Sequence, residues 1–130
     1  MSVLVADIKP SWREELGNHS WFLIHSLVYN IVDEETLKKY QQFIESLLEL
    51  YPCEVCAHHM KTLKTRAGLQ SIEWPRGRGE GDQTAMLAAE KWAWTFHNEV
   101  NKKLGKPAYP FERVCPKYKH AGENECALEL

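Results

Sequence analysis

The stretch "DEETLKKYQQFIESLLELYPCEVC", residues 33–56, decides the fold. Its apolar residues recur at steps of three and four, the spacing of one face of an α-helix: Leu37, Tyr40, Ile44, Leu47 and Tyr51. Asp33 is a suitable N-cap, and Pro52 disfavours helical geometry at the residue before it. We therefore expect an amphipathic helix over residues 34–50 that ends just before a C-x-x-C motif.

The helical pattern extends over most of the chain, and no convincing alternating strand is present. We expect an earlier helix over residues 18–31, preceded by one turn at the capping-box sequence "SWRE". A short third helix should begin near Cys53 and end around Arg66 or Gly68. A fourth should cover roughly residues 82–104 and stop at "LGKP". Residues 68–83 hold four glycines and a proline, which predicts a long flexible loop.

The expected fold class is therefore all-α: a compact four-helix bundle with an irregular C-terminal tail. With 130 residues and no internal repeat, one domain is expected, over residues 1–110, followed by a tail over residues 111–130. The net charge of −2 and scattered basic residues argue against nucleic-acid or membrane partners. No secretory signal and no apolar run of about 20 residues is visible, so we expect a soluble, intracellular protein.

Four cysteines are present, and their spacing favours two pairs, Cys53 with Cys56 and Cys115 with Cys126. The C-x-x-C motif has three interpretations: a zinc site, a redox-active disulfide, or two buried inert thiols. For zinc, His58 and His59 are the nearby ligands by type. On one helix successive side chains point about 100° apart, so these four residues cannot converge tetrahedrally, and we expect no metal.

The redox interpretation has a physical mechanism. Pro52 suits a helix start, so unpaired backbone N–H groups would face the sulfur of Cys53 and stabilise its thiolate. The thioredoxin fold is excluded because the chain lacks a βαβ pattern, so a redox site here needs another electron acceptor. Two inert buried thiols remain an alternative.

Two further stretches offer a place for such an acceptor. Trp21, His25 and Tyr29 follow one another at four-residue steps on one face of the first helix. His97 and Asn101 do the same on the fourth, close to Lys102, Lys103 and Lys106. Each residue alone is typical of a helical core. Together they could stack planar rings and neutralise a pyrophosphate.

Three blocks of the sequence resemble signature blocks of the Erv/ALR flavin-linked sulfhydryl oxidases: "REELGNHSWFLIHSLVY", "YPCEVC" and "HNEVNKKLGKP". They occur in the family's order, and the resemblance covers residues 13 to about 109. It implies a four-helix bundle that holds FAD, usually as a homodimer packed through the first helices. Cys56 would be the cysteine beside the flavin, and Cys53 the outer one that exchanges with substrate. Further positions match residues around the cofactor: Gly17, His19, Trp21, His25, Tyr29, His97, Asn101, Lys103, Lys106 and Tyr109.

The chain departs from the family pattern in two places. No cysteine lies between residues 57 and 114 to tie the third helix to the fourth, and the N-terminal segment lacks the usual shuttle pair of cysteines. Cys115 and Cys126 are therefore either a shuttle that carries electrons to Cys53 or a structural staple.

The resemblance implies an FAD-dependent thiol oxidase that forms disulfides in protein thiols and passes electrons to O₂, giving H₂O₂. Its compartment would be the mitochondrial intermembrane space or, for a virus-encoded member, the host cytoplasm or viral factory. The alternative from another class is a non-catalytic helical module with a zinc or structural C-x-x-C.

Overall fold

The computed structural model describes residues 10–63, 65–119 and 126, and over these residues it contains helices and loops but no strand. Six α-helices follow one another: α1 (Pro10–Leu27), α2 (Glu34–Leu50), α3 (Glu54–Thr62), α4 (Thr65–Gln70), α5 (Thr84–Lys103) and α6 (Val114–Tyr118). Two 3₁₀ turns, η2 (Val28–Asn30) and η3 (Phe111–Arg113), follow α1 and precede α6.

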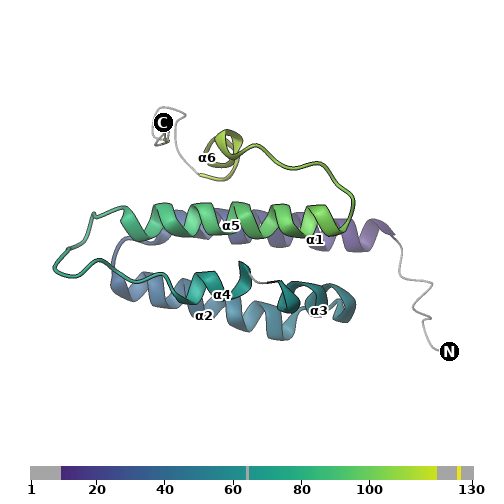
Figure 1. Cartoon of the computed structure of the whole chain (residues 1–130), viewed down its shortest axis with the longest axis horizontal. Coiled ribbons are helices and arrows are strands. Elements are labelled where there is room, and N and C mark those ends of the chain that lie inside the picture. The colour runs from purple at the N-terminus through teal and green to yellow at the C-terminus, as the bar shows by residue number, and fades with distance from the viewer. Residues whose placement is uncertain (1–9, 64, 120–125, 127–130) are drawn as a thin grey trace.

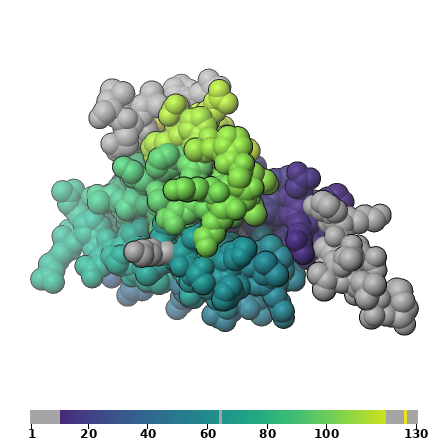
Figure 2. All heavy atoms as spheres, turned by 45° about the vertical axis from the view of Figure 1, so that its right-hand side comes forward, coloured from purple at the N-terminus to yellow at the C-terminus, as the bar shows by residue number. Residues whose placement is uncertain are grey.

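The helices form two layers (Figure 1). Helices α1 and α5 contact each other in one layer, and α2, α3 and α4 form the other. Helix α6 lies on the outer side of the α1–α5 layer, so that layer separates α6 from α3 (Figures 1 and 2). The expected all-α four-helix bundle is confirmed: α1, α2, α5 and the pair α3–α4 are its members.

The second helix forms where its sequence predicts. Asp33 is the N-cap, and its side chain accepts a hydrogen bond from the Thr36 backbone N–H at 2.8 Å. The Thr36 hydroxyl in turn accepts from the Asp33 N–H at 3.1 Å, which completes a capping box. Leu37, Tyr40, Ile44 and Leu48 are buried along one face of the helix. They join Phe96 of α5, the largest fully buried side chain in the described part of the chain.

The end of α5 also agrees with its sequence signal. Gly105 has φ +72°, and its N–H donates to the Lys102 carbonyl at 3.2 Å. The Lys106 N–H donates to the Asn101 carbonyl at 2.8 Å. This is a Schellman motif, which needs a glycine because other residues are strained at positive φ. The motif turns the chain away from α5 and toward α6.

Four boundaries differ from expectation. The first α-helix ends at Leu27 and not at Ile31, so Tyr29 lies in the 3₁₀ turn that follows it. The first helix begins at Pro10, because the turn expected at "SWRE" is continuous with it. Gly17, the residue between them that least favours a helix, does not interrupt it. The third helix is broken at Leu63, whose backbone is extended while its side chain is buried in the core. Part of the tail expected to be irregular, residues 111–118, is helical, because Val114 and Tyr118 are buried apolar side chains at helical spacing.

Candidate active site

Cys53 and Cys56 form a disulfide at the start of α3, with their Cα atoms 5.2 Å apart. Cys53 is the N-cap of the helix, and its sulfur accepts a hydrogen bond from the Cys56 N–H at 3.3 Å. A helix N-terminus stabilises negative charge, so a thiolate on Cys53 would be favoured here. The predicted pairing of the four cysteines is confirmed, since Cys115 and Cys126 form the second disulfide.

The two sulfurs have different surroundings. Cys56 is partly buried and packs against the hydrophobic core of the bundle. Cys53 is only 7% exposed, yet it lies outside that core cluster. Cys56 therefore packs against the main hydrophobic cluster, whereas Cys53 is the more buried of the two cysteines and lies outside that cluster.

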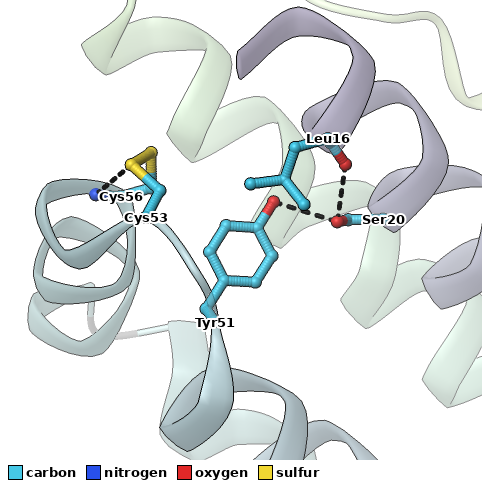
Figure 3. The surroundings of a disulfide bond; sticks show 5 residues. All are labelled: Leu16, Ser20, Tyr51, Cys53 and Cys56. Carbon is cyan, nitrogen blue, oxygen red and sulfur yellow. Dashed lines mark hydrogen bonds between the residues drawn. A yellow bond between two sulfur atoms is a disulfide. The ribbon is translucent and has the colours of Figure 1, made fainter. Parts of the chain in front are cut away.

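A hydrogen-bond chain ties the disulfide segment to α1 (Figure 3). The Tyr51 hydroxyl, two residues before Cys53, donates to the Ser20 hydroxyl at 2.9 Å. Ser20 donates in turn to the Leu16 carbonyl at 2.7 Å. Burial raises the pKa of Tyr51, so the phenol stays protonated and keeps its proton for this bond. The disulfide is thus fixed beside the turn of α1 that carries Trp21.

A pair of histidines joins α1 to α5. The Nε2 atom of His25 lies 3.0 Å from Nδ1 of His97, so one ring donates a hydrogen bond to the other. Burial, followed by the charges of His97 and Lys117, lowers the pKa of His25 to about 3. Burial, followed by Lys117 and Lys106, lowers the pKa of His97 to about 4. Both rings are therefore neutral at physiological pH.

Flat aromatic rings flank the histidine pair on both sides. Trp21 stacks on His97 with ring centroids 4.0 Å apart and planes 10° apart. Tyr118 of α6 stacks on His25 at 4.2 Å and 9°. The Lys117 ammonium lies 5.2 Å from the centre of the Tyr118 ring. The Nδ1 atom of His25 is buried without a hydrogen-bond partner among the residues described. Such an atom usually has a partner in the functional state.

Tyr29 meets a buried carboxyl. Its hydroxyl donates to Glu90 of α5 at 2.5 Å, and Glu90 is only 4% exposed. Burial, followed by this hydrogen bond, raises the pKa of Tyr29 far above its usual range. The Lys119 ammonium lies 5.8 Å from the centre of the Tyr29 ring. Lys119 directly follows α6 and Tyr29 lies in η2, so this contact joins the chain just after α6 to the turn after α1.

The remaining candidates lie around the end of α5. Asn101 is buried, whereas Lys103 and Lys106 are exposed. Lys106 lines a cavity of about 570 Å³ with Asn98, Lys102 and other residues. The Tyr109 carbonyl accepts hydrogen bonds from Trp94 at 2.6 Å and from Asn98 at 3.1 Å, which fixes the segment after α5.

Two candidates on α1 lie apart from this cluster. His19 is largely exposed and lies 3.8 Å from Glu15 of its own helix. Gly17 has open space where a side chain would be, so nothing in the described part of the chain requires a glycine there.

Sequence reasoning missed four residues of the site: Ser20, Glu90, Lys117 and Tyr118. Glu90 lies seven residues before His97, two helical turns away on the same face of α5, so its spacing was a usable signal. Tyr118 lies in a tail whose pattern carried no such signal.

Comparison with known proteins adds three findings. The model of the Erv1 / Alr family matches residues 18–120. The FAD-linked sulfhydryl oxidase ERV1 of Oryza sativa subsp. japonica is 31% identical over 98% of this chain and 63% of its own length. The mitochondrial FAD-linked sulfhydryl oxidase ERV1 of Saccharomyces cerevisiae is 29% identical over 78% of this chain and 49% of its own.

A solved structure shows the same fold. The crystal structure of the FAD binding domain of Erv1 from Saccharomyces cerevisiae matches with a TM-score of 0.59 and 24% identity. The match covers 81% of this chain and 91% of that one. The chain thus spans 63% of the length of the Oryza sativa relative and about half, 49%, of the Saccharomyces cerevisiae relative. None of the helices described is both long and apolar enough to cross a membrane.

Proposed function

The chain belongs to the Erv1/Alr family, and we propose that it is an FAD-dependent thiol oxidase that forms disulfides in protein thiols and passes electrons to O₂, giving H₂O₂. One observation carries the proposal. The Tyr51–Ser20 hydrogen bond ties the segment of the Cys53–Cys56 disulfide to the turn of α1 that leads into Trp21 and His25. This bond supports a site for planar rings close to the disulfide.

The aromatic and histidine side chains around His25 and His97 fit a flavin dinucleotide. Neutral imidazoles and flat aromatic faces suit planar rings, and the buried Nδ1 atom of His25 offers a hydrogen bond that no described residue takes up. Lys103 and Lys106 could face a pyrophosphate. We propose this cofactor-binding set: Gly17, His19, Trp21, His25, Tyr29, Cys56, His97, Asn101, Lys103, Lys106 and Tyr109. When bound, FAD supplies a two-electron acceptor that O₂ reoxidises.

We assign Cys53 as the cysteine that exchanges with substrate. A substrate thiolate attacks Cys53 Sγ, the Cys53–Cys56 bond breaks, and Cys56 leaves as a thiolate. A second substrate thiolate then attacks the substrate sulfur of the mixed disulfide and releases Cys53. Two substrate thiols lose two protons and two electrons in total, and the electrons reside on the reduced cysteine pair.

The position of Cys53 at the helix N-terminus supports its role as the cysteine that forms the mixed disulfide and is then released. The better a thiolate is stabilised, the more readily it leaves. The N-terminus of α3, whose Cys56 N–H already faces Cys53 Sγ, favours release of Cys53 in the second step. We propose that Cys56, which packs against the core, passes the electrons inward.

We propose that the Cys115–Cys126 disulfide is a staple. Figures 1 and 2 show α6, which carries Cys115, on the far side of the α1–α5 layer from α3. A shuttle would need to cross that layer to reach Cys53. We propose that the cofactor domain covers residues 1–110 and that the tail over residues 111–130 contributes Tyr118, which stacks on His25.

We infer that the partners are protein thiols, O₂ and a second copy of the chain. The homodimer would pack through α1, where three large apolar side chains are 43–53% exposed: Trp12, Phe22 and Leu23. The compartment proposed is the mitochondrial intermembrane space or, for a virus-encoded chain, the host cytoplasm or viral factory; the name of the Saccharomyces cerevisiae relative includes the word mitochondrial.

The experiment is an oxygen-electrode and peroxide assay on the full chain with dithiothreitol as substrate. We expect O₂ uptake matched by H₂O₂ release, and no uptake by the Cys53→Ser/Cys56→Ser double variant. A flavin-loaded protein that consumes no O₂ with any dithiol would overturn the proposal.

A further inference from the structure

Three exposed apolar residues lie close to Cys53 in the sequence, on both sides of it, and we call them the apolar rim: Leu50, Pro52 and Val55. Leu50 is 80% exposed, the highest value for a large hydrophobic side chain in the described part of the chain. Val55 is 57% exposed. Single exposed apolar side chains are common, but a group of them often marks a binding surface.

The rim lies next to Cys53 on both sides. Consecutive Cα atoms are 3.8 Å apart, so the Cα of Leu50 lies at most about 11 Å from that of Cys53, and the Cα of Val55 at most about 8 Å. The rim is therefore within reach of the residues that flank a substrate cysteine at Cys53.

The rim is held in place by contacts between elements. The Tyr51–Ser20 hydrogen bond fixes the residue between Leu50 and Pro52 (Figure 3). Arg66 of α4 lies 2.7 Å from Glu45 of α2, and Lys61 of α3 lies 3.3 Å from Glu49. These ion pairs tie the end of α2 to α3 and α4, so the rim is a preformed surface.

We propose that the apolar rim docks an extended apolar segment of the reduced protein substrate, next to the cysteine that attacks Cys53. The inference rests on the proposed oxidase function and specifies its substrate class: cysteines flanked by apolar residues. Burial of apolar surface is the attraction that such a contact supplies. Glu54 between Cys53 and Val55 is exposed, so acidic flanks are disfavoured.

A second copy of the chain is the competing occupant of the rim. The exposed face of α1, with Trp12 and Leu23, already offers a surface for a partner copy. A copy seated on the rim would obstruct the approach to Cys53, which any thiol oxidation requires. The substrate is therefore the occupant that fits the chemistry.

The test compares three substrates: dithiothreitol and two synthetic peptides of equal length with the same C-x-x-C core, one flanked by leucines and one by serines. The proteins are wild type, Leu50→Gln/Val55→Gln, and the control Val32→Gln. Val32 is 42% exposed and precedes α2, whose 17 residues place it about 25 Å from Leu50. Glutamine removes the apolar surface without adding charge.

Wild type and Val32→Gln should oxidise the leucine peptide with a kcat/KM about tenfold above that for the serine peptide, equivalent to about 1.4 kcal/mol. The rim variant should lose this preference, keep its rate with dithiothreitol and keep its mass in sedimentation. Equal rates with both peptides in wild type would overturn the docking proposal while leaving the oxidase function intact. A rim variant whose mass in sedimentation differs from that of wild type would also overturn the docking proposal, because a second copy of the chain would then occupy the rim. Loss of dithiothreitol oxidation by wild type would instead refute the proposed function.

Discussion

His25 of α1 and His97 of α5 share a hydrogen bond of 3.0 Å in the interior of the molecule, with Trp21 stacked on one ring and Tyr118 on the other. Both imidazoles are neutral because burial lowers their pKa values. The pair therefore joins two helices without a net charge, and its protonation would break the arrangement.

The first prediction concerns acid stability. In the unfolded chain both histidines take up protons near pH 6.5, whereas in the folded chain they do so only near pH 3 and pH 4. The unfolded state therefore binds more protons below pH 6.5. The free energy of unfolding should fall as pH drops from 6.5 toward 4, by up to about 1.4 kcal/mol per pH unit for each histidine.

Urea denaturation between pH 7.5 and 4.5 measures this slope. His97→Gln should reduce it, while His59→Gln, a change on the exposed face of α3, should leave it as in wild type. The same slope in wild type and His97→Gln would mean that His97 is not held neutral by the fold.

The second prediction separates the two cysteines of the motif. If Cys56 contacts the flavin, its thiolate in Cys53→Ala should donate charge to the ring and produce a broad long-wavelength absorption band. Cys56→Ala should show none, and both variants should lose oxidase turnover. A band confined to Cys56→Ala would reverse the assignment of the two roles.

The third prediction concerns the tail disulfide. A staple that closes a loop of about a dozen residues stabilises the fold by roughly 3 kcal/mol in the chain-entropy model. Cys115→Ser/Cys126→Ser should therefore melt several degrees lower, and it should oxidise dithiothreitol and a reduced protein more slowly to the same extent. Unchanged melting with slower oxidation of the protein alone would show that the pair is a shuttle.

The fourth prediction concerns Glu90. Tyr29→Phe removes one hydrogen-bond donor from this buried carboxyl, and it should lower the free energy of unfolding by about 1–3 kcal/mol. Tyr118→Phe keeps the ring that stacks on His25 and should change stability little. Chemical denaturation of the two variants at pH 7 provides the comparison. An equal effect of the two changes would refute a specific role for the Tyr29–Glu90 contact.

Local signals in the sequence predicted much of the fold. Asp33 begins a helix because its side chain accepts a hydrogen bond from the nearby Thr36 N–H. Gly105 ends a helix because its N–H donates to the nearby Lys102 carbonyl. The break at Leu63 was not predictable in this way, because no proline or glycine marks it and the burial of Leu63 in the core imposes it.

The site also has residues that a local sequence pattern predicted and residues that only contacts between distant segments bring in. The four-residue steps from Trp21 to Tyr29 indicated one face of a helix, and the structure places Trp21 and His25 against His97. The contact of Tyr118 with His25 joins residues 93 positions apart, and no local pattern encodes it. Glu90 was missed because a single charged residue in a helix is usually exposed.

The central claim is that electrons pass from substrate thiols through Cys53–Cys56 to a flavin held against His25 and His97. Anaerobic addition of dithiothreitol to the purified, flavin-loaded protein tests it most directly. The absorption band of oxidised flavin should bleach in wild type and return when O₂ is admitted. It should persist in Cys53→Ser/Cys56→Ser with the flavin still bound. Bleaching of the double variant at the wild-type rate would contradict the account, because the flavin would then accept electrons without the disulfide.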